Sequence, residues 1–296
     1  MDSESLETFL AVHRRGGVSA AAIALKRTQS AISRRLALLE QEAGAPLFDR
    51  IGRGLVLSEV GSALLPYAER VAAAIGDARA AVDAAKSGAA GTVRMVTVGT
   101  LANSMLAKIL RRVTAKLPNI DLRMQTATSS EVSAKVRMGE ATVGLRYFAD
   151  NSPDLDCRII QEERLLVACS PSHRLAGKRL KQLAPLAKER WLAFPTHKEH
   201  VEVFASTVFA HFLTHGIGQI DSVAIDSLTA QKRLVEAGFG IALLQASAIE
   251  EELKRRELAV ISVEDLQASV PVARVIRRGS YLSGGTQVLL KELEQN

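Results

Sequence analysis

The N-terminal segment of this chain carries the pattern that most constrains its fold, a set of three short helices. Apolar residues recur at helical spacing over 4–15, and a glycine pair follows them. Ser19 is expected to cap a short second helix, and Thr28 a third helix after the tight connection at 26–27. Small alanines on the second helix allow the third to cross it closely. This spacing predicts a helix-turn-helix.

The charge of the same segment favours a polyanionic partner. Between Thr8 and Leu39 there is no acidic residue, whereas the basic residues are Arg14, Arg15, Lys26, Arg27, Arg34 and Arg35. The whole chain has 38 Lys and Arg against 32 Asp and Glu, so its basic excess is modest and is concentrated here. We expect Gln29 and Ser33 to reach base edges while arginines hold phosphates.

A short hairpin is predicted next, because two apolar runs flank a glycine turn at 51–54. Arg50 and Arg53 would lie on this wing, beside the DNA backbone or in the minor groove. The predicted DNA-binding residues are Thr28, Gln29, Ser30, Ser33, Arg34, Arg35, Arg50 and Arg53. The alternative is a solvated basic surface on a small helical domain.

A long helix is expected from Ser58 to about Ser87. Its apolar positions follow alternating steps of four and three residues, namely Leu64, Ala68, Val71, Ile75, Ala78, Val82 and Ala85. This is an a/d pattern, and its alanines would let two helices approach closely, which predicts a homodimer through residues 59–86. The alternative is an amphipathic helix that packs on its own domain. Residues 87–91 are expected to form a hinge.

Residues 91–296 alternate strand and helix patterns, which predicts parallel sheets with crossover helices. Ligands of open α/β sheets bind beyond the carboxyl ends of the strands, where free N–H groups favour anions. The residues at predicted strand ends are Thr100, Thr128, Ser129, Arg146 and Asp226. They favour a small polar or anionic ligand. The alternatives are plain helix capping for the hydroxyl residues and a structural ion pair for Arg146.

Evidence for other chemistry is weak. His211 and His215 have the spacing of a metal pair, and His197 and His200 are close in sequence, but surface or packing roles are preferred. The two cysteines, Cys157 and Cys169, are expected to be inert thiols. The sequence contains no nucleophile motif, phosphate loop or complete metal-ligand motif, so we expect no enzyme activity, no cofactor and no metal. It also contains no apolar run long enough for a membrane span and no signal peptide, which predicts a cytoplasmic protein.

Several N-terminal motifs carry a family resemblance. They lie at residues 6–9, 16–25, 28–36, 39–40, 44, 47–50 and 57–61. Together they resemble the LysR-type transcriptional regulators, and residues 154–155, 172–176 and 235–242 look like the sensor domain of that family. The chain departs from the usual pattern at Gly17, where Ser is common, at Thr142, where an acid is common, and at Gln245, where Pro is common.

The resemblance implies an α/β protein with an all-α winged helix-turn-helix domain (1–58), a linker helix and hinge (59–90) and an effector-binding domain (91–296). That last domain would resemble type 2 periplasmic binding proteins, with subdomain I at about 91–165 and 268–296 and subdomain II at about 166–267. A co-inducer would bind in its cleft. Family members are commonly cytoplasmic homotetramers that bind inverted repeats and contact RNA polymerase.

Carried onto this chain, the resemblance places Gln29, Ser33 and Arg34 on the reading helix and Arg50 on the wing. Positions that commonly face the effector match Thr100, Thr128, Pro195, Thr196 and Asp226. We therefore predict a sequence-specific transcriptional regulator controlled by a small effector. Two alternatives are a small-molecule binding protein of the periplasmic-binding fold without specific DNA reading, and an enzyme working in the cleft.

Overall fold

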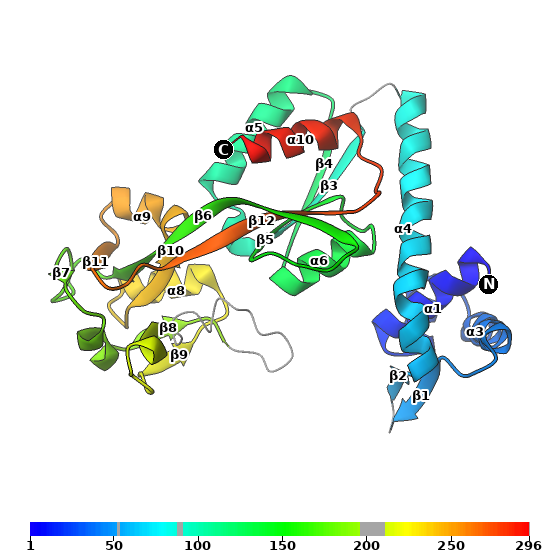
Figure 1. Cartoon of the computed structure of the whole chain (residues 1–296), viewed down its shortest axis with the longest axis horizontal. Helices are drawn as coiled ribbons and strands as arrows, with labels where there is room; N and C mark the ends of the chain where they lie inside the picture. The colour runs from blue at the N-terminus through cyan, green and yellow to red at the C-terminus, as the bar shows by residue number, and fades with distance from the viewer. Residues whose placement is uncertain (52–53, 88–90, 196–210, 296) are drawn as a thin grey trace. The chain divides into compact units, whose positions relative to one another are not determined.

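The computed structural model describes residues 1–51, 54–87, 91–195 and 211–295. The chain divides into two compact units, the first formed mainly by Met1–Ser87 and the second by most of the remaining residues (Figure 1). Each unit has its own hydrophobic core and is described by itself.

The N-terminal unit contains the predicted helices and hairpin. They are α1 (Ser3–Arg15), α2 (Val18–Ala24), α3 (Gln29–Ala43), β1 (Phe48–Ile51), β2 (Gly54–Leu57) and α4 (Glu59–Ser87). Gly16 ends α1 in the left-handed conformation, and the hydroxyl of Thr28 caps α3 by accepting from the N–H of Ala31. The prediction for Ser19 is wrong, because α2 begins at Val18 and Gly17 occupies the N-cap position without a side-chain bond.

The core of this unit joins all three short helices to the hairpin. Phe9 of α1 is fully buried, and its ring lies 5.4 Å from that of Phe48. Glu40 of α3 accepts a hydrogen bond of 2.8 Å from the N–H of Leu47, which holds the connection to the hairpin. At the start of α4, a Cβ on Gly61 would lie only 2.0 Å from the carbonyl oxygen of Leu47. Glycine is therefore required there by close backbone approach.

The apolar a/d residues predicted along α4 lie in two different environments. Ala68 is fully buried and Leu64 packs on the core of the N-terminal unit, as the self-packing alternative expects. Further along, Val71 is 40% exposed and Val82 is 50% exposed. The first part of the helix thus completes its own domain, while the later part keeps apolar side chains at the surface.

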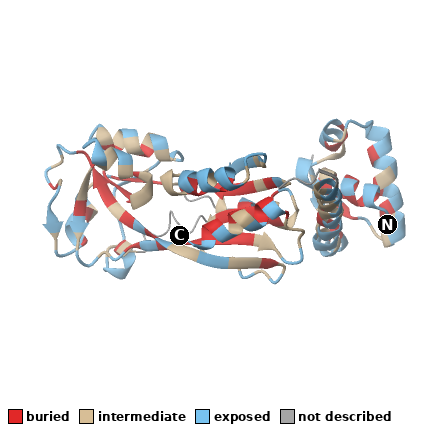
Figure 2. Ribbon diagram, turned by 90° about the horizontal axis from the view of Figure 1, so that it is seen from above, coloured by how far each residue is buried: buried red, intermediate tan, exposed pale blue. Residues whose placement is uncertain are grey.

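The C-terminal unit is built on an eight-stranded sheet of order β4-β3-β5-β12-β6-β11-β7, with β10 also paired to β6. Its strands are β3 (Thr92–Val98), β4 (Asp121–Ala127), β5 (Val143–Tyr147), β6 (Leu155–Cys169), β7 (Arg179–Leu180), β10 (Ala242–Gln245), β11 (Ala259–Val263) and β12 (Ser269–Arg277). A separate two-stranded sheet pairs β8 (Trp191–Ala193) with β9 (Ser222–Ala224). The helices that flank the strands are α5 (Ser104–Lys116), α6 (Ser129–Arg137), α8 (Leu228–Glu236), α9 (Glu250–Lys254) and α10 (Gly284–Glu294). In Figure 2 the strands of this unit carry long runs of buried residues.

The prediction of parallel sheets is confirmed only in part. Strand β3 is parallel to β4 and β5, but β12 is antiparallel to β5 and β6, and β10 and β11 are antiparallel to β6. The cause is β6, a strand of 15 residues that pairs antiparallel with β10, β11 and β12. Its first part is mixed in polarity because one face is exposed. Strand β6 pairs with β12 as far as Arg164 and with β10 from Leu165, so it runs through both subdomains.

Candidate nucleic-acid interface and effector site

Helix α3 presents one apolar face to the core and one polar face to solvent. Ile32, Leu36 and Leu39 are buried, whereas Ser33 and Arg34 are exposed. The first turn contains no acidic side chain. Its unpaired backbone N–H groups and the helix dipole therefore favour an anion such as a phosphate.

The N-terminus of α3 is held by polar side chains. The hydroxyls of Thr28 and Ser30 lie 3.1 Å apart, and Gln29 donates from Nε2 to the hydroxyl of Ser19 in α2. All four side chains belong to exposed residues. The predicted reading residues Gln29, Ser30 and Ser33 thus lie together with Arg34 on the first two turns of one helix.

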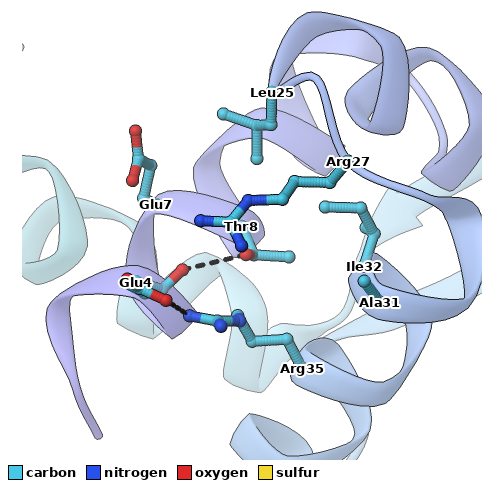
Figure 3. Close-up of a pocket in the computed structure, with 8 residues that line it drawn as sticks. All are labelled: Glu4, Glu7, Thr8, Leu25, Arg27, Ala31, Ile32 and Arg35. Atoms are coloured by element: carbon cyan, nitrogen blue, oxygen red, sulfur yellow. Dashed lines mark hydrogen bonds and ion pairs between the residues drawn. The ribbon is translucent and has the colours of Figure 1, made fainter.

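Arg35 has a different environment from Arg34. It forms an ion pair with Glu4 of α1 and lines a small surface pocket between α1 and α3 (Figure 3). The pocket is lined by Glu4, Glu7, Thr8, Leu25, Arg27, Ala31, Ile32 and Arg35. In this structure Arg35 links α3 to α1, on a different flank of the helix from Arg34.

The wing has the predicted hairpin form. Phe48 pairs with Leu57 and Ile51 pairs with Gly54, so Phe48 and Leu57 point to the core. Arg50 is exposed on β1. Arg53, the second predicted wing arginine, lies outside the described residues.

In the C-terminal unit, three neighbouring parallel strands bring predicted effector residues to one edge. Val98 pairs with Ala127, and Thr97 pairs with Leu145, so β3, β4 and β5 end side by side. Thr100 and Thr128 follow the first two strands, and Ser129 accepts a hydrogen bond of 3.4 Å from the N–H of Tyr147.

Thr128 also has the capping role that the sequence left as an alternative. Its N–H donates to the carboxylate of Glu131 at 2.8 Å, and the N–H of Glu131 donates back to the Thr128 hydroxyl at 3.4 Å. This reciprocal pair is a capping box at the start of α6.

Arg146 lies in the structural ion pair that the sequence also left open. Its guanidinium donates to Asp150 at 2.9 Å and bonds the hydroxyl of Ser133, and its side chain is only 14% exposed. Burial alone would raise the pKa of Asp150, but hydrogen bonds from Ser152 and Ser133 and the charge of Arg146 lower that pKa to about 2. The Arg146 guanidinium is therefore already paired with Asp150 and Ser133 at the end of β5.

Sequence reasoning did not place Tyr147 at this strand edge, and it noted Gln245 only as a departure from the family pattern. The Tyr147 hydroxyl lies 2.8 Å from that of Thr100, and Gln245 donates from Nε2 to the same phenol at 2.9 Å. Nearby, Asn103 donates to the hydroxyl of Ser247 at 2.8 Å. Tyr147 follows Arg146 directly and points to the opposite face, so strand alternation was the available signal.

A second pair of predicted residues follows β8 and β9. These strands are parallel, with Ala193 opposite Ala224, so Pro195 and Asp226 follow neighbouring strand ends. Asp226 is exposed, and the next residue, Ser227, caps α8. Thr196 lies outside the described residues.

The histidines and cysteines considered as metal or redox groups contact other parts of the protein. His215 approaches Asp265 at 3.3 Å, and its ring nitrogen Nδ1 lies 2.6 Å from the carbonyl oxygen of His211. Burial, with the charge of Glu189, raises the pKa of Cys169 to about 11, and the sulfur of Cys157 accepts from the N–H of Asp150. Within the described ranges, no cluster of three or more His, Cys, Asp or Glu could hold a metal. None of the helices in those ranges combines the length and the hydropathy of a transmembrane segment. His197 and His200 fall outside those ranges.

Two family models match this chain. The bacterial regulatory helix-turn-helix model of the LysR family matches residues 3–62, and the LysR substrate binding domain matches residues 86–296. The chain belongs to the LysR family. It is a DNA-binding transcriptional regulator with an effector-binding domain of two subdomains.

Individual relatives of this LysR-type regulator match it over most of its length. It is 33% identical to the HTH-type transcriptional regulator ShiR of Corynebacterium glutamicum over 245 residues, 82% of each chain. It is 27% identical to TfdS of Cupriavidus pinatubonensis over 92% of this chain and 91% of the relative. The crystal structure of the LysR family regulator CbnR superposes with a TM-score of 0.66, at 24% identity and with 100% and 99% coverage. CbnR has also been solved with its target DNA, and that structure gives a TM-score of 0.65.

Proposed function

We propose that this regulator reads an inverted-repeat operator with α3 and the β1–β2 wing, under the control of a small polar or anionic effector. The observation that carries the proposal is the exposed face of α3, where Ser30, Ser33 and Arg34 stand opposite a fully packed core face. A helix with one buried face and a short polar opposite face is the form that enters a major groove.

The partners follow from the same function. An inverted repeat requires two reading helices about 34 Å apart, or a multiple of that spacing, and hence a homodimer. The exposed apolar residues of α4, including Val71 and Val82, support a dimer through residues 59–86. We propose further that two dimers form a homotetramer, that the regulator contacts RNA polymerase, and that it works in the bacterial cytoplasm without catalysing a reaction.

The effector is proposed to bind at the strand ends that carry Thr100, Thr128 and Ser129, together with Pro195, Thr196 and Asp226. Support comes from the adjacent carboxyl ends of β3, β4 and β5, the position where open α/β sheets hold ligands. Effector binding would change closure of the two subdomains and thereby the spacing of the paired reading helices.

The test of DNA reading is footprinting of the intergenic DNA beside the gene, at a stated salt concentration with competitor DNA. The wild-type protein should protect an inverted repeat. Arg34→Ala should weaken binding to the matched operator by about 1–3 kcal/mol if this side chain reads a base. Arg111→Ala, which removes an exposed arginine from α5, is the matched control and should leave protection unchanged.

The outcomes separate the candidate functions. Equal loss on matched and mismatched operators would limit Arg34 to a phosphate contact. If the wild-type protein protects no sequence above non-specific binding, the proposal that α3 and the wing read an inverted repeat in this DNA is refuted.

A further inference from the structure

The flank of α3 that faces α1 brings two basic side chains together with two acidic ones. Arg27 and Arg35 line the small pocket between these helices, and Glu4 and Glu7 of α1 line its other side. In Figure 3 both guanidinium groups extend toward α1. The formal charges of these four side chains cancel, so this flank differs from the exposed face of α3, which carries Arg34.

Glu4 is the acid that holds Arg35. Its carboxylate forms an ion pair with Nη1 of Arg35, whereas Asp2 serves as the N-cap of α1 and accepts from the N–H of Ser5 at 2.8 Å. The side chain of Glu4 is 56% exposed and that of Arg35 is 33% exposed. An ion pair that is this exposed is weak, so another anion can displace the Glu4 carboxylate from the guanidinium.

A DNA phosphate is the anion that would compete for this guanidinium. Side chains of an α-helix point toward its N-terminus, so Arg35 extends along α3 toward the turn that carries Ala31, which lines the same pocket. A reading helix enters the major groove with its N-terminal residues at the bases, and the phosphates that border the groove then lie along its flanks. Arginine binds phosphate and carboxylate through the same donors.

We propose that Glu4 is a positioning residue that holds Arg35 away from the DNA backbone. In the free protein the Arg35 guanidinium is paired with the Glu4 carboxylate, and a phosphate must displace that carboxylate before Arg35 can bind DNA. Glu4 thereby weakens binding to DNA of any sequence, because phosphate contacts carry no sequence information. This inference rests on the proposed reading of DNA by α3.

The test is a double-mutant cycle of Glu4→Gln and Arg35→Gln in the full-length protein. Fluorescence anisotropy measures binding to a labelled mixed-sequence duplex of about 30 base pairs, at about 50–200 mM salt. Glu4→Gln should tighten binding about two- to fivefold, the ratio that corresponds to an exposed ion pair. In the Arg35→Gln background the same change should have a smaller effect, and the difference between the two effects measures the competition for Arg35.

The sign of the effect separates this role from a structural one. If the ion pair only supported the packing of α1 on α3, Glu4→Gln would weaken DNA binding, whereas competition predicts tighter binding. The gain should also shrink as the salt concentration rises, because both the ion pair and the phosphate contact are screened. Circular dichroism checks that the helices of each variant are intact.

Glu7→Gln is the matched control. It removes the same charge from the same helix and the same pocket, about one turn from Glu4. Its effect on DNA binding should not depend on whether Arg35 is present, because the observed ion pair of Arg35 is with Glu4. An equal dependence of both variants on Arg35 would assign the effect to the general charge of α1 and overturn the proposal.

The proposal is also overturned if Glu4→Gln leaves binding unchanged or weaker, or if its gain is the same with and without Arg35. Arg34→Ala is measured on the same duplex, and the operator footprint of the wild-type protein is measured in parallel. An intact footprint with no coupling in the cycle removes this inference alone. If neither Arg34→Ala nor any variant of the cycle changes DNA binding, the proposed reading by α3 fails as well.

Discussion

Replacing Asp150 with Asn should destabilise the C-terminal unit by about 2 kcal/mol at neutral pH. The carboxylate accepts from Ser152 and from Arg146, and its side chain is only 17% exposed, so solvent screens these contacts weakly. Its pKa falls from the ordinary 3.8 to about 2. Each pKa unit corresponds to about 1.4 kcal/mol, which gives the stated magnitude.

The sign of the pH dependence follows from that lowered pKa. The folded protein holds the Asp150 proton less tightly than the unfolded chain, so the stabilisation is complete above the unfolded pKa near 3.8. It is lost as the pH falls through the folded value of about 2. The difference in stability between the wild-type protein and Asp150→Asn should therefore be constant from pH 7 to about pH 5 and shrink in acid.

The assay is urea unfolding of the full-length protein, followed by the fluorescence of Trp191 at several pH values. Trp191 is 1% exposed and lies in the same unit as Asp150, so it reports unfolding of that unit. Asp121→Asn is the control, because Asp121 and its partner Arg123 are exposed and such pairs contribute little. Equal stability of the two variants at pH 7 would show that the contacts of Asp150 do not stabilise the C-terminal unit. Arg146 would then again be a candidate for binding the effector.

Two further outcomes are expected. Gly61→Ala should unfold the N-terminal unit or lower its free energy of unfolding by about 3 kcal/mol or more, because the new Cβ would lie 2.0 Å from the Leu47 carbonyl oxygen. Circular dichroism and operator binding measure this loss. A variant as stable as the wild-type protein would contradict the close approach. Cys169 should react with iodoacetamide far more slowly than Cys157 at pH 8, because burial raises the pKa of Cys169 to about 11. Mass spectrometry of the alkylated peptides measures both rates. Equal rates would show that Cys169 is accessible.

Local patterns predicted the N-terminal unit well because its elements depend on short-range interactions. The left-handed Gly16, the Thr28 cap and the apolar spacing of α3 are properties of residues close in sequence. The error at Ser19 is also local, since any hydroxyl near a helix start resembles a cap. The backbone contact that requires Gly61 is with Leu47, 14 residues earlier. The sequence motif at 57–61 could therefore be recognised, but the close backbone approach that requires its glycine could not be predicted.

The candidate effector site was predicted only in part. Strand ends identified Thr100, Thr128 and Ser129, because parallel strands bring their carboxyl ends to one edge. Arg146 was correctly placed at a strand end, but its partner depends on Asp150 in the following turn. Tyr147 and Gln245 are separated by 98 residues, and no sequence pattern predicts such a bond.

The helix-turn-helix, its basic charge and the alternation of strands and helices could be predicted from the sequence, because periodicity, capping and charge depend on neighbouring residues. The antiparallel strand pairs, the ion pair that joins an arginine of α3 to α1, and the hydrogen bonds between β5 and β10 could be found only from the folded structure. Each of them joins residues that are far apart along the chain. Burial and hydrogen bonding between remote segments depend on how β6 passes through both subdomains, and that path is a property of the whole packed sheet.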